Sequence, residues 1–109
     1  MLQQHHRLPG AIRLISPRSF NTTLFFLKVG KNDIQQSRFG FVVRKTVDKR
    51  ATTRNRVRRV FRSCVEEMLE EIKPGYDMLF LLKGHILEMK REELYNELHA
   101  FFKEQQFLQ

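Results

Sequence analysis

The sequence predicts a single α+β domain that spans residues 1–109. Two segments are rich in the aromatic and β-branched residues that strands prefer, a third short segment is almost wholly apolar, and two longer segments carry apolar residues at helical spacing. After a short N-terminal helix these elements follow in the order β, β, α, β, α, so the middle of the chain is expected to form a strand–helix–strand unit. A hydrophobic content of 41% in 109 residues is enough for one modest core.

The N-terminal region is polar and is expected to be flexible over residues 1–7. Residues 8–16 are expected to form a short helix that ends before Pro17. Its inward-facing residues are expected to include Ile12 and Ile15.

Residues 20–29 and 38–45 are predicted strands, because both have strand-like composition and the turn-forming run 30–37 separates them. They are expected to pair antiparallel across that connection. Because side chains alternate between the two faces of a strand, four residues of this pair are expected to share one face of the sheet. These are Phe26, Lys28, Val42 and Arg44.

The longest helix is predicted to begin where Thr52 or Thr53 can cap its N-terminus and to continue to about Ile72. The breaker Lys73-Pro74-Gly75 follows it. An apolar stripe at helical spacing is expected to face the core. The stripe comprises Val57, Phe61, Cys64, Val65, Met68 and Ile72.

Residues 77–83 form a third strand that is almost wholly apolar. This composition is typical of an interior strand that is covered on both faces and has a parallel neighbour. Residues 90–105 follow as a final amphipathic helix, and its inward side is expected to comprise Leu94, Leu98, Phe101 and Phe102. For the strand–helix–strand unit that ends at residue 83, a right-handed crossover is the physical default.

Positive charge is concentrated in one segment, residues 44–62, which reads RKTVDKRATTRNRVRRVFR. Nine of its nineteen residues are Arg or Lys, and only Asp48 opposes them. Residues 1–62 carry a formal charge of +13 and residues 63–109 one of −5, which together give the +8 of the chain. This distribution predicts that one end of the fold contacts a polyanion while the other end stays solvated.

A solvated basic face is the simplest alternative, but helical phase and residue type favour nucleic-acid binding. Most of the cations are arginines, whose guanidinium groups fork onto phosphate oxygens, and Asn55 can reach a 2′-hydroxyl. On the predicted helix, five polar residues fall within an arc of roughly 140° beside the apolar stripe: Arg54, Asn55, Arg58, Arg59 and Arg62. The complete set of candidate nucleic-acid-binding residues is Arg44, Lys45, Lys49, Arg50, Arg54, Asn55, Arg56, Arg58, Arg59 and Arg62.

The strand and the basic segment also follow a specific pattern, in which FGFVV precedes RK, a basic turn and RNRVRR. This pattern resembles the signature of the bacterial ribonuclease P protein subunit. The matching positions are Gly40, Val43, Lys45, Lys49, Arg50, Ala51, Arg54, Asn55, Arg56, Arg58, Arg59 and Arg62. The resemblance implies a two-layer α/β sandwich of about αβββαβα order with a mixed four-stranded sheet. It also implies a left-handed βαβ crossover and an additional short strand, for which the residues around 18–20 are the best candidates.

The resemblance further implies a role in removing the 5′ leader of precursor tRNA. In that family the RNA subunit is the catalyst and uses Mg²⁺, and the protein docks on this RNA through its cationic turn and helix. The sheet face and the first helix form a cleft for the single-stranded leader. The candidate leader-binding residues here are Phe26, Lys28, Val42, Arg44, Ile12 and Ile15.

Two departures from the family's pattern bear on these roles. The family usually has a second lysine after the strand, whereas here Lys45 is followed by Thr46, so that phosphate contact is either lost or made by Arg44. The family's first helix is usually longer and carries paired aromatic residues. The short helix expected here offers Ile12 and Ile15 instead, which weakens the expectation of leader stacking by this helix.

Several other classes of protein are not indicated. The sequence has no nucleophile motif, metal-ligand spacing or phosphate-binding loop, so no catalytic residue and no protein-bound metal are predicted. Cys64 is the single cysteine and is expected to be a core residue, which fits a reducing, cytoplasmic location. Apolar runs are far shorter than the ~20 residues of a membrane span, and the N-terminus does not resemble a secretory signal.

Two alternative functions would use the same cationic helix. A ribosomal or RNA-chaperone protein would bind RNA through it without a leader cleft. A DNA-binding domain would place it in a major groove, but the partner helix of a helix-turn-helix is missing and strands precede the helix.

Overall fold

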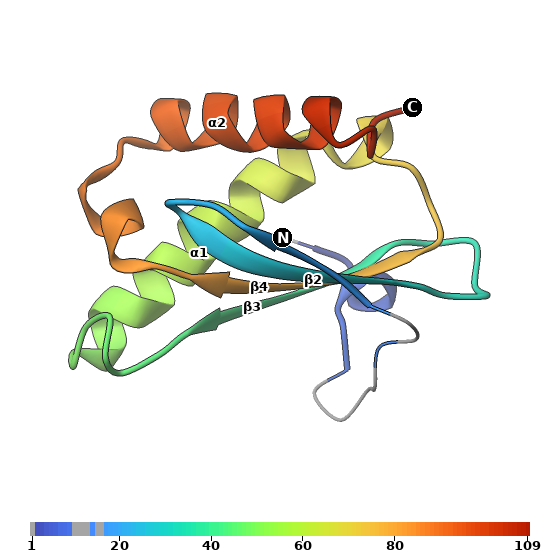
Figure 1. Cartoon of the computed structure of the whole chain (residues 1–109). Helices are drawn as coiled ribbons and strands as arrows, with labels where there is room; N and C mark the ends of the chain where they lie inside the picture. Colours follow the sequence, from blue (N-terminus) through green and yellow to red (C-terminus); the bar gives the residue numbers. More distant parts are fainter. Residues whose placement is uncertain (1, 10–13, 15–16) are drawn as a thin grey trace.

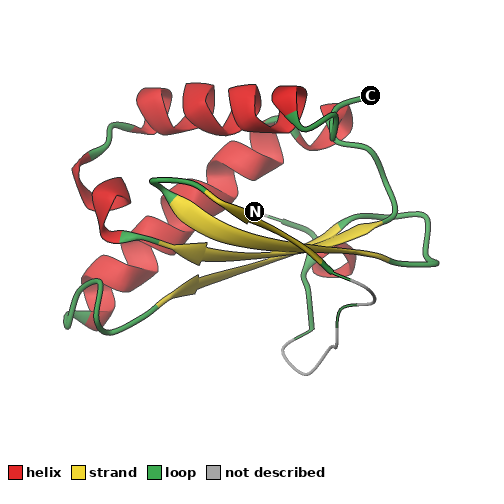
Figure 2. Cartoon of the chain, in the orientation of Figure 1, coloured by secondary structure: helices red, strands yellow, loops and turns green. Residues whose placement is uncertain are grey.

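The computed structural model describes residues 2–9, 14 and 17–109. A four-stranded mixed sheet carries both long helices on one face, which confirms the predicted α+β class (Figure 1, Figure 2). The strands are β1 (Arg18–Asn21), β2 (Phe25–Lys31), β3 (Arg38–Val43) and β4 (Tyr76–Leu82). The helices are α1 (Ala51–Glu67) and α2 (Arg91–Glu104), and short 3-10 turns form η1 (Gln4–His6), η2 (Leu69–Glu71) and η3 (Gly84–Glu88).

β4 lies inside the sheet, whose strand order is β1-β2-β4-β3. It pairs antiparallel with β2 and parallel with β3, so β3, α1 and β4 form the predicted βαβ unit. The predicted antiparallel pairing of residues 20–29 with residues 38–45 is wrong, because β4 is inserted between these strands. The insertion follows from composition, since the most apolar strand buries the most surface in the interior of a sheet. The left-handed sense of the crossover stays an expectation from the family resemblance.

Residues 20–29, predicted as one strand, are divided between β1 and β2. Thr22 makes the division, because its hydroxyl oxygen accepts hydrogen bonds from the backbone N–H groups of Leu24 at 3.2 Å and Phe25 at 3.1 Å. A side chain that bonds its own backbone in this way favours a turn over a continuous strand. β1 is the additional short strand that the family resemblance placed near residues 18–20.

Aromatic side chains on the helix-facing side of the sheet form the centre of the core. Phe80 of β4 is fully buried, and the centre of its ring lies 5.2 Å from that of Phe25 and 5.0 Å from that of Phe61 on α1. Cys64 is also fully buried, as predicted, and burial raises the pKa of its thiol. These contacts hold α1, with its cationic surface, against β4 and β2.

The opposite face of the sheet is only partly covered. Met78, Phe80 and Leu82 of β4 are buried against the helices, whereas Leu79 and Leu81 between them are half-buried. The prediction that this strand is covered on both faces is therefore wrong for the face opposite the helices. We call that face the open face.

The N-terminal residues that the structure describes contact β3 beside the open face. The backbone N–H of Leu8 donates to the carbonyl of Phe39 at 2.8 Å. A Cβ atom added at Gly40 would come within 3.2 Å of Leu79 and 3.3 Å of Leu8, so this glycine leaves room for the Leu8 side chain on the sheet. The predicted helix over residues 8–16, with Ile12 and Ile15, falls mostly outside the described residues and stays a prediction.

The ends of the helices differ in how well the sequence predicted them. α1 begins at Ala51 with Arg50 as its N-cap, so the predicted capping role of Thr52 or Thr53 is wrong, and Thr53 is instead buried. α1 also ends at Glu67, before the predicted Ile72, and the tighter turn η2 follows. α2 matches its prediction to within one residue at each end. Of its four predicted inward residues, Leu94, Leu98 and Phe102 are buried and Phe101 is half-buried.

Candidate nucleic-acid interface

The basic turn that joins β3 to α1 is organised around Asp48. Its carboxylate accepts a hydrogen bond from Nε of Arg50 at 3.1 Å, one from Nη2 at 2.9 Å and one from the backbone N–H of Arg50 at 2.8 Å. The side-chain bonds from Arg50, followed by the backbone bond, lower the pKa of Asp48 to about 2. The only acid of residues 44–62 is therefore engaged with one arginine and leaves the other cations unneutralised.

Arg54 fastens this turn to α1. Its Nη1 donates to the backbone carbonyls of Asp48 and Lys49, both at 2.9 Å. The side chain is half-buried, although Arg54 belongs to the predicted polar arc. Its guanidinium satisfies two carbonyls that precede the helix, which makes it a positioning residue for the turn.

Arg58 and Arg62 lie on the same side of α1 as Arg54. Nη2 of Arg58 donates to Oδ1 of Asn55, and the guanidinium of Arg62 lies 5.8 Å from the centre of the Phe41 ring on β3. Both arginines are half-buried, whereas Asn55 is exposed. The exposure of the predicted arc therefore varies. Its arginines on the side toward the sheet make contacts within the protein, whereas the residues on its outer side are exposed to solvent.

A second group of cations within residues 44–62 is exposed and makes no side-chain hydrogen bond or ion pair with the described part of the chain. We call this group the free cations. They can reach phosphate oxygens without breaking an internal bond, and their neutralisation would release counterions from the nucleic acid. The free cations are Arg44, Lys45, Lys49, Arg56 and Arg59.

The open face of the sheet lies beside the basic turn. Phe26 of β2 and Val42 of β3 both stand opposite Leu81 of β4, so the three residues form one row across the sheet. Val42 is 38% exposed, which is a large fraction for an apolar side chain in a strand. Lys28 stands opposite Leu79 in the next row of this face and is exposed. Phe26, Lys28 and Val42 therefore share a face as predicted, whereas Arg44, the fourth residue of that prediction, follows the end of β3 at Val43.

A depression of about 470 Å³ lies at the end of this row, and both Phe26 and Arg44 line it. Its other lining residues are Thr46, Val47, Leu81, Leu82, Lys83 and Gly84. An apolar lining next to the free cation Arg44 can contact both the bases and the phosphates of a single strand, whereas Nζ of Lys83 donates to Asn21 and Thr22. Leu81 and Lys83 are not among the site residues predicted from the sequence. Leu81 lies in an apolar run without alternation, so the sequence gave no sign of which face it occupies.

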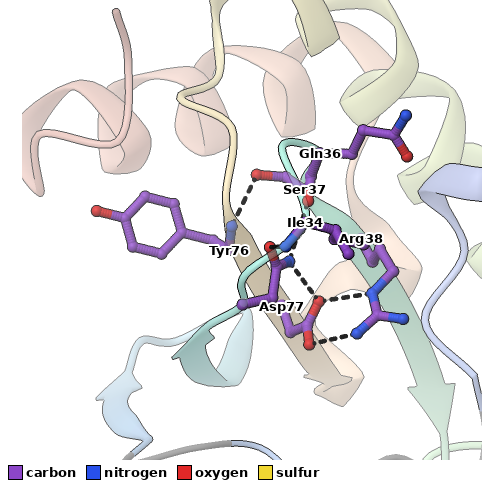
Figure 3. A network of polar contacts seen from close by, with 7 residues as sticks. Ile34, Gln36, Ser37, Arg38, Tyr76 and Asp77 are labelled. Carbon is purple, nitrogen blue, oxygen red and sulfur yellow. Dashed lines mark hydrogen bonds and ion pairs between the residues drawn. The ribbon is translucent and has the colours of Figure 1, made fainter.

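A polar network at the other end of β3 fixes this strand against β4 (Figure 3). Nε and Nη2 of Arg38 each donate to a carboxylate oxygen of Asp77 at 2.8 Å, and Nδ2 of Asn32 donates to the same carboxylate at 2.9 Å. Burial of Asp77 opposes its ionisation, but the bonds from Arg38 and Asn32 outweigh it, so the pKa of Asp77 lies below its usual value. The hydroxyl of Ser37 accepts a bond from the backbone N–H of Tyr76 at 3.2 Å. The network therefore positions the open face, and Arg38 is not available to a ligand.

The opposite half of the molecule is acidic. Glu67 and Glu71 are exposed and are paired with Arg91 at 3.4 Å and His99 at 3.2 Å. No group of three or more His, Cys, Asp or Glu residues in the described chain is arranged to hold a metal ion. None of the described helices has both the length and the apolar character needed to cross a membrane.

Comparison with known proteins identifies the family. A family model described as Ribonuclease P matches residues 13–106. The ribonuclease P protein component of Synechocystis sp. is 30% identical over 108 residues, which cover 89% of this chain and 87% of that protein. The corresponding protein of Fusobacterium nucleatum is 33% identical over 87 residues, with 76% of each chain covered.

Solved structures share the fold. The RNase P protein from Thermotoga maritima matches with a TM-score of 0.74 at 22% identity, over 82% of this chain and 84% of that one. The RNase P protein of Staphylococcus aureus matches with a TM-score of 0.74 at 20% identity, over 85% and 84% of the two chains. These identities support the shared fold alone, whereas the family model covers most of the sequence. The chain therefore belongs to the ribonuclease P protein component family.

Proposed function

We propose that this chain is the protein subunit that binds a ribonuclease P RNA and contacts the 5′ leader of precursor tRNA. The observation that carries the proposal is the placement of the free cations. They extend along the basic turn and α1, and Arg44 among them lines the depression that also contains Phe26. One surface can therefore contact a folded RNA while its edge contacts a single strand.

Electrostatics gives this surface its role. The catalytic RNA and precursor tRNA are both polyanions and repel each other. A segment with excess positive charge placed between them lowers that repulsion by replacing condensed counterions. The holoenzyme is therefore expected to cleave at a lower Mg²⁺ concentration than the RNA alone.

The open face supplies discrimination between substrate and product. Only the precursor carries a leader, so contacts with the leader tighten precursor binding and leave mature tRNA binding unchanged. The proposed contacts are stacking of a base on Phe26, apolar contact with Val42, and phosphate contacts from Lys28 and Arg44. Aromatic stacking combined with basic side chains is the usual mode of single-strand binding. Ile12 and Ile15 remain proposed additional contacts.

We assign the chemical step to the RNA subunit. The described residues form no cluster of metal ligands, and the acids of the chain lie mainly on the helical half away from the free cations. Mg²⁺ held by RNA would activate the attacking water and stabilise the leaving oxygen. This chain's residues would bind and orient the two RNAs.

The experiment that tests this function is reconstitution. The chain is added to a protein-free ribonuclease P RNA, and cleavage of precursor tRNA is followed at low and high Mg²⁺. Stimulation at low Mg²⁺ that requires the leader is the expected result. If the chain strengthens the binding of leaderless tRNA as much as the binding of precursor tRNA, its role would instead be that of a general RNA-binding or chaperone protein. Cleavage by the protein without RNA would overturn the assignment of catalysis.

A further inference from the structure

A second pocket lies on the flank of α1 opposite Arg54. Its volume is about 210 Å³, and α1, η3 and the start of α2 enclose it. The floor consists of the buried residues Val57, Ile86 and Leu94. The walls consist of the half-buried residues Val60, Leu87 and Met89. The pocket is therefore apolar inside, although it opens on the most basic helix of the protein.

Two arginines stand at its mouth and complete the lining, in which no acid takes part. Arg56 is one of the free cations. Arg91 is exposed, and its position is fixed, because Nε donates to the hydroxyl of Ser63 at 3.1 Å and Nη2 lies 3.4 Å from Glu67. Arg56 can therefore turn toward an anion at the mouth, while Arg91 shapes the opposite rim.

A second depression of nearly the same size provides a comparison within the molecule. It measures about 220 Å³, lies between α2 and the turn that joins β1 to β2, and is lined by Glu97 and Glu104 together with Ala100. The pocket and this depression have similar volumes, but the charged side chains that line them are arginines in the first and glutamates in the second. A polyanion is attracted to the pocket beside Arg56 and repelled by the one beside Glu97 and Glu104.

We propose that the pocket beside Arg56 receives one unpaired nucleotide of the RNA that α1 binds, with the base inside and its phosphate on Arg56. Proteins read RNA chiefly through unpaired bases that are splayed out of the helical stack, and such a base needs an apolar enclosure next to a phosphate contact. Arg56 belongs both to the free cations and to the pocket mouth, so a single nucleotide can make both contacts. This inference rests on the proposed function and adds a base-binding site to it.

The test places a phenylalanine side chain in the pocket beside Arg56 and, separately, in the acidic depression. Val60→Phe places a ring in the proposed base pocket, and Ala100→Phe places one in the acidic depression as the matched control. Affinity for a ribonuclease P RNA is measured over a range of salt concentrations, and thermal unfolding checks that both variants are folded. Val60→Phe should weaken RNA binding on the order of 10-fold, the effect of losing one base contact. Ala100→Phe should leave the affinity unchanged.

Salt dependence separates the base from the phosphate. Exclusion of the base displaces no cation from RNA, so Val60→Phe should keep the wild-type log–log slope, whereas Arg56→Ala should reduce its steepness by about 1. Leu87→Phe fills the same pocket from η3 and replaces Val60→Phe if that variant does not fold. Chemical probing should show one unpaired base of the RNA that is protected by the wild-type protein and reactive with the filled variant.

Wild-type affinity and unchanged base protection in a folded, filled variant would overturn the base pocket. Failure of the wild-type chain to bind the RNA at all would instead overturn the proposed function, so the two failures can be told apart.

Discussion

Nη1 of Arg54 donates a hydrogen bond to the backbone carbonyl of Asp48 across a distance of 2.9 Å. The same nitrogen donates to the carbonyl of Lys49, so one side chain of α1 holds the turn that precedes the helix. The cationic surface thus consists of two kinds of residue. Arg50 and Arg54 have partners that shape the turn, and the free cations on either side have none in the described chain.

Arg54→Ala is expected to destabilise the protein, because two backbone carbonyls lose a charged donor. Hydrogen bonds to charged groups contribute about 1.5–3 kcal/mol each when buried, and partial exposure here reduces the expected loss to about 1–2 kcal/mol in total. Arg59→Ala is the matched control, since it removes an exposed arginine without a partner and should change the free energy of unfolding by less than about 0.5 kcal/mol. Denaturant unfolding measures both, and equal effects would contradict the positioning role of Arg54.

Asp48 gives the basic turn a defined pH dependence. Its folded pKa of about 2 lies below its ordinary value, so its contribution to stability is present above the ordinary pKa and is lost as the pH falls through the folded one. The window of loss is therefore about pH 4 to pH 2. An NMR titration of the Asp48 carboxyl should report the low pKa, and Arg50→Ala should raise it toward its usual value. If the pKa of Asp48 is the same in Arg50→Ala as in the wild type, the pair of Asp48 and Arg50 does not form in solution.

The buried pair of Arg38 and Asp77 is expected to support the fold and not RNA binding. Asp77 is 4% exposed, so Arg38→Ala leaves a carboxylate in the interior without its cation. Removing one partner of a fully buried pair costs about 3–5 kcal/mol, and the partial exposure of Arg38 together with the remaining bond from Asn32 reduces the expected loss below this range. Lys31→Ala, which removes the same charge from an exposed position on β2, should have little effect on unfolding. A salt dependence of RNA binding that changes in Arg38→Ala but not in Lys31→Ala would mean that Arg38 contacts phosphate.

Phe26→Ala tests the leader contact. Loss of one stacking contact should weaken binding of precursor tRNA by the holoenzyme by about 1–3 kcal/mol. Binding of mature tRNA and assembly with the ribonuclease P RNA should stay at the wild-type level, because neither involves the leader. A series of precursors with progressively shorter leaders supplies the measurement. Equal weakening for precursor and mature tRNA would reassign Phe26 to the core.

The features that could be predicted from the sequence depend only on the residues of a single helix or strand. The inward residues of α2 follow from their spacing alone, since Leu94, Leu98 and Phe102 recur on one side of a helix. Phe26 and Val42 lie on a common face as predicted, because each stands next to inward-facing residues of its own strand. The inward residues of α2 were predicted without reference to other elements, whereas the common face of Phe26 and Val42 was predicted from a strand pairing that is wrong.

The features that could not be predicted depend on which segments far apart in the sequence contact each other. The pairing of β2 with β3 was predicted from their closeness in sequence, but β4 binds to both and separates them. In the basic turn, Asp48 has several arginines within reach, and the sequence does not indicate that Arg50 pairs with its carboxylate while Arg54 binds its carbonyl. The pocket beside Arg56 also requires η3 and α2 to meet α1, which no local pattern specifies.

The salt dependence of RNA binding is the measurement that tests the central claim most directly. If the free cations neutralise phosphates, log affinity should fall steeply with log salt, and Arg59→Ala should reduce the steepness by about 1. Lys103→Ala removes one positive charge from an exposed helical position on the acidic half and should leave the slope unchanged. The two variants change net charge equally and differ only in position. Equal changes of slope in both would mean that diffuse charge alone binds RNA, and would contradict a defined interface on the basic turn and α1.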